Sequence, residues 1–143
     1  MPRHIVIFIL SVTVFTTVQS QLENYVIVRS QSLCIPPYQK VGKQCLFFSR
    51  PHSPWGLSDT WHQAYKSVYD AAVFCMAHDG QLAEQVQDFK SALDLCATVR
   101  GGCAPSLVAR RGHCFQWNPL DGSEIEIPCN HPDLKARFIC QQN

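Results

Sequence analysis

Apolar residues change their spacing along this chain, and each change predicts a different kind of element. The segment Cys34–Phe48 reads CIPPYQKVGKQCLFF, in which Gly42 suits a tight turn and Leu46–Phe48 is a short apolar run. This pattern predicts a β-hairpin. The consecutive prolines Pro36 and Pro37 restrict its first arm to an extended or edge position, because proline donates no hydrogen bond to a neighbouring strand.

Helical spacing follows the hairpin and predicts two helices. The first is expected over Thr60–Ala77, with Asp59 or Thr60 as its N-cap. Gly80 is expected to end this helix in the left-handed conformation. A second, shorter helix is expected to begin at Gln81–Ala83. The apolar face of the first helix consists of Ala64, Val68, Ala71, Ala72 and Cys75, and that of the second of Val86, Phe89, Leu93 and Cys96.

Short strands are expected in the last third of the chain, after two consecutive glycines break the helical pattern. The predicted strands are Ser106–Ala109, Cys114–Trp117, Ser123–Pro128 and Lys135–Cys140. The composition of Asn118–Gly122 predicts a turn. Polar and apolar residues alternate in Ser123–Pro128, which predicts a half-buried strand. The order of hairpin, two helices and several strands predicts an α+β fold.

The N-terminal residues have the features of a secretory signal. A short basic start is followed by Ile5–Val18, an apolar run without charge. A membrane anchor is the alternative, but the run is shorter than the roughly 20 residues that span a bilayer. Val18–Ser20 offers residues suited to cleavage. We therefore expect Met1–Ser20 to be a removed signal peptide, and Gln21–Leu33 to be a polar lead of the secreted, extracellular protein.

The charge balance weakens two classes of partner. The chain has 12 Lys+Arg and 11 Asp+Glu, and the expected signal peptide contains one Arg and no acid. The secreted chain is therefore close to neutral, and it has no long basic run. These properties argue against nucleic acid or an anionic membrane as the main partner, and we expect no membrane insertion.

All eight cysteines follow the expected signal peptide. An even number of cysteines in a secreted chain predicts disulfide bonds. A zinc site is the alternative, but the chain has no C-x-x-C pair and no Cys/His set with finger spacing. Eight cysteines allow 105 pairings, so spacing alone does not choose among them. The cysteines are Cys34, Cys45, Cys75, Cys96, Cys103, Cys114, Cys129 and Cys140.

Three stretches resemble the C-type lectin-like domain family, in its longer form with an N-terminal hairpin. The hairpin segment is similar to the family's Cys-Pro…Gly…Cys-Tyr-Phe start. The sequence AAVFCMAHDGQLAE, residues 71–84, is similar to its Ala-x-x-x-Cys…Gly-x-Leu-Ala pattern, and IPCNHPDLKARFIC, residues 127–140, to its Cys…Phe-Ile-Cys ending. The resemblance implies a C-type lectin-like domain over residues 34–143, with two helices and short antiparallel strands.

The resemblance also implies a set of disulfides. In this family the last strand returns to the first helix and is tied to it, which here implies Cys75–Cys140. Two further family bridges imply Cys114–Cys129 and Cys34–Cys45. The two cysteines left over, Cys96 and Cys103, are expected to pair with each other as an addition to the common pattern.

The residues depart from the family where calcium and sugar are usually bound. Calcium requires six to eight oxygen ligands, and the family's Trp-Asn-Asp position is here Glu124–Glu126, in which Ile125 cannot ligate. The long-loop motifs are missing, and Cys103 and Cys114 are too close for that loop. In a second possible alignment, the segment around Trp117 matches the family's stretch before the long loop, and the loop itself is deleted altogether. Both alignments predict no calcium site and no cofactor, and Asn118 and Asp121 are more typical of a turn.

The candidate binding residues are the cations Arg110, Arg111 and His113 together with Trp117, since Arg and Trp are frequent anchors of interfaces. The alternative is a solvated loop beside a core tryptophan. Glu124 and Glu126 are a carboxylate pair on one strand face, but alternating acids are typical of a solvated strand, and the histidines fall in no catalytic motif. We expect no enzyme activity.

The expected function is therefore that of a secreted C-type lectin-like binding module. The module is expected to bind an extracellular glycan or protein ligand without calcium. The resemblance implies a role in innate recognition or in interactions within an extracellular fluid. The alternative is a small secreted inhibitor or toxin-like protein that blocks an enzyme or receptor. A structural matrix component is a third, weaker reading. The oligomeric state is not predicted.

Overall fold

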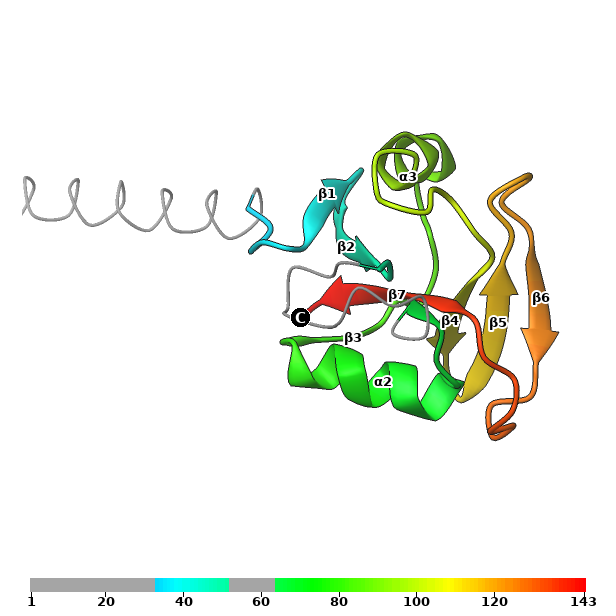
Figure 1. The fold of residues 1–143 in the computed structure, drawn as a ribbon. Coiled ribbons are helices and arrows are strands. Elements are labelled where there is room, and N and C mark those ends of the chain that lie inside the picture. Colours follow the sequence, from blue (N-terminus) through cyan, green and yellow to red (C-terminus); the bar gives the residue numbers. More distant parts are fainter. Residues whose placement is uncertain (1–32, 52–63) are drawn as a thin grey trace, which may run out of the picture. The chain divides into compact units, whose positions relative to one another are not determined.

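The computed structural model describes residues 33–51 and 64–143, and these residues form an α+β domain with two helices and a mixed sheet (Figure 1). The expected signal peptide, residues 1–20, and almost all of the expected lead lie outside the described residues. So do Asp59 and Thr60, the expected caps of the first helix. Within the described ranges, no helix combines the length and the apolar character that crossing a membrane requires.

The N-terminal hairpin is confirmed. Strands β1 (Gln39–Val41) and β2 (Gln44–Phe48) pair antiparallel, with Val41 opposite Gln44. Gly42 adopts a φ of +62° in the turn between them, a conformation that glycine allows without strain. The peptide bond between Pro36 and Pro37 is cis.

The last strand is the centre of the sheet. The strands follow the order β1-β2-β7-β4-β5-β6, and β3 also pairs with β7. All pairs are antiparallel except β4–β7, which is parallel and makes the sheet mixed, whereas only antiparallel strands were expected. The chain therefore closes on itself, because β7 lies between the early strand β2 and the later strand β4. The remaining strands are β3 (Gly80–Leu82), β4 (Ser106–Arg110), β5 (His113–Trp117), β6 (Glu124–Ile127) and β7 (Arg137–Gln142).

The sheet separates two cores. Alternate residues of β7 point to opposite faces, so that Phe138 and Cys140 join one core and Ile139 joins the other. Helix α2 (Val68–Ala77) packs on the first core through Ala71 and Cys75, and helix α3 (Phe89–Cys96) packs on the second. Figure 1 shows the two helices on opposite sides of β7.

Helix α2 begins later than expected. Ser67 is its N-cap, and the Ser67 hydroxyl accepts a hydrogen bond from the Asp70 backbone N–H at 3.2 Å. Immediately before the cap, Lys66 pairs with Ala136 through two backbone hydrogen bonds of 2.9 and 3.0 Å. This pairing holds the backbone extended, so the predicted start at Thr60 was wrong. The predicted end at Ala77 is confirmed.

The role expected of Gly80 was also wrong. Asp79, not Gly80, has the left-handed φ of 58°, and Gly80 is the first residue of β3. A Cβ atom at Gly80 would clash with the Tyr38 hydroxyl and would lie 2.5 Å from the Gln141 carbonyl oxygen. Glycine is therefore required here by the close approach of neighbouring atoms.

Residues 80–82 form a strand, not the start of the second helix. Gln81 pairs with Gln141 of β7, and this pairing overrides the helical spacing of the apolar residues. Helix α3 begins only after Asp88, whose carboxylate accepts the Ser91 backbone N–H at 3.1 Å. The predicted apolar face is confirmed for Phe89, Leu93 and Cys96, which all pack in the second core.

Four disulfides join the eight cysteines, and all four expected pairs are confirmed. Cys75–Cys140 ties α2 to β7 and closes a sequence separation of 65 residues. Such a density of disulfides is typical of secreted or extracellular proteins. The pairs are Cys34–Cys45, Cys75–Cys140, Cys96–Cys103 and Cys114–Cys129.

Candidate functional site

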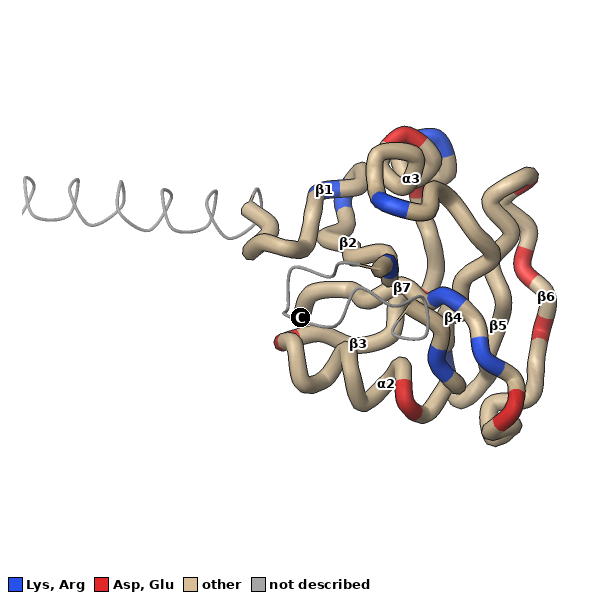
Figure 2. Tube along the Cα trace, in the orientation of Figure 1, with Lys and Arg blue, Asp and Glu red and all other residues tan. Residues whose placement is uncertain are grey.

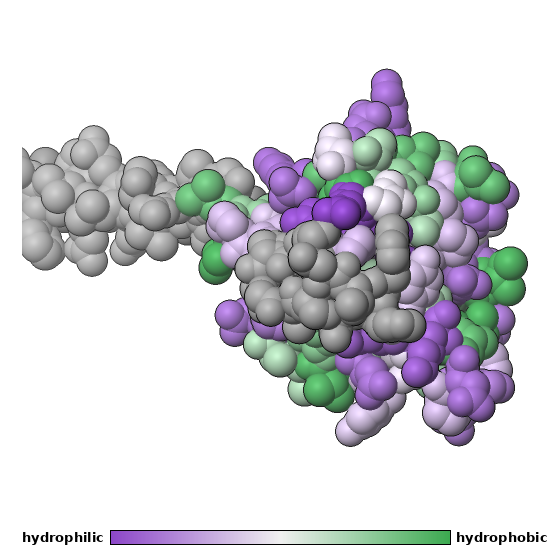
Figure 3. Space-filling model, in the orientation of Figure 1, coloured by the Kyte–Doolittle hydropathy of each residue, from purple (hydrophilic) through white to green (hydrophobic). Residues whose placement is uncertain are grey.

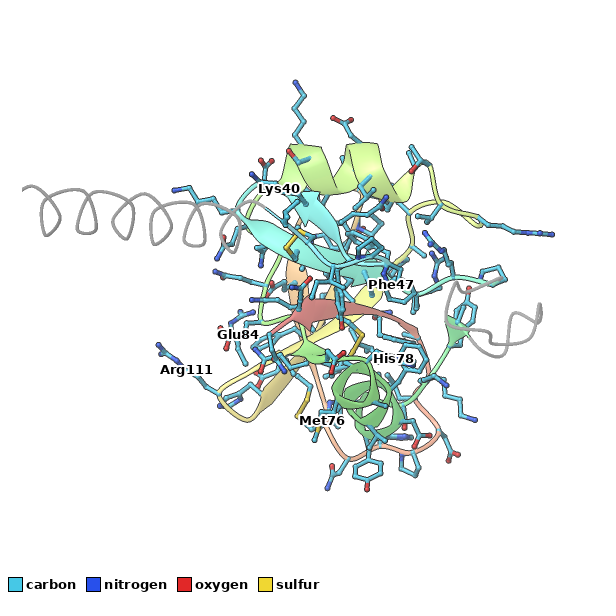
Figure 4. All side chains as sticks on the ribbon, turned by 90° about the vertical axis from the view of Figure 1, so that its left-hand side faces the viewer. Lys40, Phe47, Met76, His78, Glu84 and Arg111 are labelled. Atoms are coloured by element: carbon cyan, nitrogen blue, oxygen red, sulfur yellow. A yellow bond between two sulfur atoms is a disulfide. The ribbon has the colours of Figure 1, made fainter. Side chains whose placement is uncertain are left out.

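The β4–β5 hairpin carries all four expected binding residues, three of them at its turn and Trp117 at the far end of β5. Arg110 ends β4, His113 begins β5, and only Arg111 and Gly112 lie between them. Both turn residues have positive φ, 52° and 78°, as a two-residue type I′ turn requires. The Arg111 side chain is exposed and extends away from the tip of the hairpin (Figure 4).

Arg110 is held by three groups. Its Nη1 atom lies 2.6 Å from Glu124 Oε2 of β6 and donates to the Glu84 carbonyl oxygen at 3.1 Å. Its guanidinium carbon also lies 4.0 Å from the centroid of the Phe115 ring, a cation–π contact. The Arg110 side chain is 33% exposed and the Glu124 side chain 18% exposed, so this ion pair is partly shielded from water.

His113 pairs with the second acid of β6. His113 Nδ1 lies 2.7 Å from Glu126 Oε1, and both side chains are well exposed. Strand β6 places Glu124 and Glu126 on one face, opposite Trp117 and Phe115 of β5. Figure 2 shows these acidic positions on the outer strand. We call Arg110, His113, Glu124 and Glu126 the paired-charge cluster.

Trp117 does not belong to the surface. Its side chain is only 1% exposed, and it packs near Phe48 and Phe89 at centroid distances of 6.2 Å. This position supports the alternative of a core tryptophan beside a surface cluster. The structure therefore brings Arg110, Arg111 and His113 together and separates Trp117 from them by burial.

Strand β6 is partly buried at one of its two apolar positions: Ile127 packs against the first core, as the alternation predicted, but Ile125 does not. Ile125 is 64% exposed, whereas Glu124 is partly buried by its contact with Arg110. The reason is position, because β6 is the outer strand of the sheet and pairs only with β5 among the described strands. Green surface at the outer edge of the molecule in Figure 3 lies at the level of β6.

A surface hollow of about 400 Å³ lies beside the paired-charge cluster. Its lining consists of Glu84, Gln85, Arg110, Arg111, His113 and Phe115. Arg110 and His113 are engaged with acids, whereas Arg111 makes no hydrogen bond or ion pair with the residues that the structure describes. An acidic ligand would therefore meet one available cation here instead of the basic patch that the sequence predicts.

The oxygen atoms near β6 are engaged within the chain. Asn118 Oδ1 accepts the Leu120 backbone N–H at 2.9 Å. Asp121 Oδ1 accepts from the Ser123 hydroxyl and backbone N–H at 2.6 and 2.9 Å, and these bonds lower the pKa of the Asp121 carboxyl. Both side chains thus stabilise the turn. Among the described residues, no three His, Cys, Asp or Glu side chains gather in a way that could hold a metal ion.

A second hollow, not expected from the sequence, lies between the first turn of α2 and the loop from β6 to β7. Its volume is about 500 Å³. We call it the α2 hollow, and its lining consists of Ser67, Tyr69, Asp70, Cys129, Asn130, His131, Pro132 and Lys135. The signal in the sequence was the helix itself, because α2 is apolar almost all round. Such a helix is normally buried, yet Tyr69, Val73 and Met76 are exposed.

The exposed side of α2 is visible in two views. Green surface lies at the level of α2 below the grey residues in Figure 3, and Figure 4 shows Met76 on the outer side of the helix. Met76 is 70% exposed and Tyr69 is 73% exposed. The helix therefore presents apolar groups to the surface next to the α2 hollow.

No model of a known protein family matches the chain, and no curated protein matches it.

Proposed function

We propose that this chain is a secreted binding module with a C-type lectin-like fold, which recognises an extracellular glycan or protein ligand without calcium. The observation that carries the proposal is the closure of the domain. Strand β7 is tied to α2 by Cys75–Cys140, as the family resemblance implies, and it also pairs with β2. The hairpin bridge Cys34–Cys45 and the bridge Cys114–Cys129 add support, because both are also implied by the resemblance.

Independence of calcium is supported by the way the β6 carboxylates are used. Glu124 contacts Arg110 and Glu126 contacts His113, so each carboxylate already has a basic partner. Ile125 between them provides no oxygen ligand in its side chain. The two-residue turn at Arg111 and Gly112 joins β4 directly to β5, which leaves no room for a ligand loop at that point. Calcium prefers six to eight oxygen ligands, so we expect it to bind weakly to a site with so few available oxygens.

Calcium and EDTA provide the test. We expect the secreted protein to bind glycans on an array, or a protein in a pull-down, equally well in millimolar calcium and in EDTA. Its melting temperature should not change with calcium, because only a ligand bound by the folded state adds stability. A rise of about 5 °C or more, which corresponds to roughly 1 kcal/mol in a domain of this size, would contradict the proposal.

The proposal also requires that the protein bind a glycan or an extracellular protein in the absence of calcium. Failure to bind any glycan on the array and any extracellular protein in the pull-down would overturn the binding function itself. Loss of binding in EDTA alone would overturn only its independence of calcium. The two results are distinguishable because the absence of any ligand would be seen both with calcium and with EDTA, whereas dependence on calcium would be seen with EDTA only.

A further inference from the structure

The α2 hollow has the size and the lining of a ligand site. Its volume of about 500 Å³ lies within the range of about 300–1,000 Å³ that is typical of small-molecule sites. The Tyr69 and Pro132 rings and the sulfur of Cys129 provide apolar surface. Polar side chains complete the lining, and they are Ser67, which caps α2, together with Asp70, Asn130, His131 and Lys135.

The hollow is formed in advance, because its loop is anchored at both ends. At one end, the disulfide to Cys114 fixes Cys129 to β5. At the other end, Ala136 pairs with Lys66 next to the α2 cap. Within the loop, the Leu134 N–H donates to the His131 carbonyl oxygen at 3.2 Å. Binding to such a pre-organised site loses less conformational entropy than binding that must first order a loop.

The polar side chains of the hollow are available to a ligand. Within the described part of the chain, the side chains of Asp70, Asn130, His131 and Lys135 make no hydrogen bond or ion pair with one another or with other residues. Together they offer both donors and acceptors, since the lysine and the amide nitrogen donate and the carboxylate and the amide oxygen accept. A ligand rich in hydroxyl groups can use both kinds, because each hydroxyl donates and accepts.

Tyr69 provides the apolar platform. Its side chain is 73% exposed, and tyrosine combines a flat apolar ring with low loss of conformational entropy on binding. The charges around it nearly cancel, with the carboxylate of Asp70 opposed by the ammonium of Lys135. A strongly anionic or cationic ligand would therefore gain little over a neutral one.

We propose that the α2 hollow binds a neutral saccharide unit. The apolar C–H face of the sugar ring lies against Tyr69, and its hydroxyl groups bond with Asp70, Asn130 and Lys135. This inference rests on the proposed binding function. It specifies the ligand as a neutral saccharide and the binding site as the α2 hollow.

The experiment compares single variants of the whole secreted chain. Wild type is screened on an array of neutral, sialylated and sulfated oligosaccharides, and the neutral oligosaccharide with the strongest signal is then titrated by calorimetry. Tyr69→Ala should weaken its binding about 10-fold or more, in the range of an interface anchor. Tyr69→Phe should retain most of it. Met76→Ala is the matched control, because Met76 is as exposed on the same helix but does not line the hollow.

The readout also separates this inference from the proposed function. Equal sugar affinity of wild type and Tyr69→Ala, with unchanged melting temperatures, would overturn the site and leave the function standing. A wild type that binds no glycan but captures a protein would overturn the site and leave the protein arm of the function. Equal losses in Tyr69→Ala and Met76→Ala would indicate a broad docking face of α2 and would also overturn the saccharide site. Binding to neither class of ligand would overturn both proposals.

Discussion

The paired-charge cluster and the α2 hollow differ in how their polar groups are satisfied. In the cluster, Arg110 and His113 contact Glu124 and Glu126 at 2.6 and 2.7 Å, so each of these side chains already has a partner within the chain. The hollow is lined by the exposed Tyr69 and by four polar side chains. Among the described residues, these four make no hydrogen bond or ion pair. The cluster is the denser group of charges in the sequence, yet the hollow has more groups available to a ligand.

The difference teaches that charge density along a sequence is a poor guide to a binding surface. A sheet that places acids on the same face as nearby bases converts a basic motif into a stabilising contact. A loop that is anchored at its ends can instead hold polar groups apart. The cluster should therefore affect mainly stability and the hollow mainly binding, and three predictions examine this contrast.

The largest effect is expected from the disulfide that joins the two regions. Cys114 lies in β5 beside the cluster, and Cys129 lines the hollow. Replacing both by alanine should cost about 3 kcal/mol of unfolding free energy, as expected for a 15-residue loop. It should also weaken ligand binding, because the loop loses one anchor. Denaturant unfolding and calorimetric titration measure the two effects.

The control for this prediction is the double alanine variant of Cys96 and Cys103. That bridge spans only seven residues and lies outside the α2 hollow, so stability should fall while ligand affinity is retained. If the Cys114/Cys129 variant bound its ligand with wild-type affinity, the disulfide would not be an anchor of the hollow.

An intermediate effect is expected at Arg110. Arg110→Ala removes an ion pair and a cation–π contact and should lower the unfolding free energy by about 1–2 kcal/mol. The neighbouring Arg111→Ala is the matched control, since it removes the same charge without losing a described partner. Urea unfolding should show a clear loss for the first variant and almost none for the second. Equal losses would contradict the assignment of the cluster to stability.

The smallest effect is expected at the opposite end of α2 from the hollow. The Tyr38 hydroxyl donates to the His78 carbonyl oxygen at 2.7 Å, and burial, assisted by the negative charge of Asp79, raises the pKa of Tyr38 to about 12. Tyr38→Phe should cost about 1 kcal/mol at neutral pH through the lost hydrogen bond. Ligand affinity of the hollow should be unchanged.

The pH dependence of this variant follows from the raised pKa. The protonated hydroxyl is favoured by folding, so its contribution is complete below the ordinary tyrosine pKa of about 10 and is lost as the pH rises toward 12. The stability difference between wild type and Tyr38→Phe should therefore shrink between pH 10 and pH 12 in urea unfolding. A difference that stays constant over this range would show that the Tyr38 hydroxyl is not responsible.

Much of the fold could be predicted from local pattern. The turn at Gly42 and the strands around Leu107 and Phe115 follow from chemistry that acts between near neighbours, namely turn conformation and apolar alternation. The α+β order and the four disulfides were also expected, although the pairing came from the family resemblance and not from spacing. For the site, the sequence identified Arg110, Arg111 and His113 as a surface group. It did not show that Glu124 contacts Arg110 or that Glu126 contacts His113.

Contacts between distant segments decided the rest. Lys66 is extended because Ala136 pairs with it, and Gln81 is in a strand because Gln141 does. Arg137 is 3% exposed because its guanidinium reaches the carbonyl oxygens of Ser49 and Gly102, which no pattern around residue 137 indicates.

The same reason explains why the sequence alone determined the scaffold but not its surfaces. Turns and cysteine content depend on residues close in the chain or on composition, so they can be predicted from the sequence, whereas the cap of α2 was set by the distant pairing of Lys66 with Ala136. Whether Trp117 is buried, whether Glu124 meets Arg110, and whether Tyr69 borders a hollow depend on which strands and loops become neighbours. Only the closed tertiary structure, with β7 between β2 and β4, brings those groups together or keeps them apart.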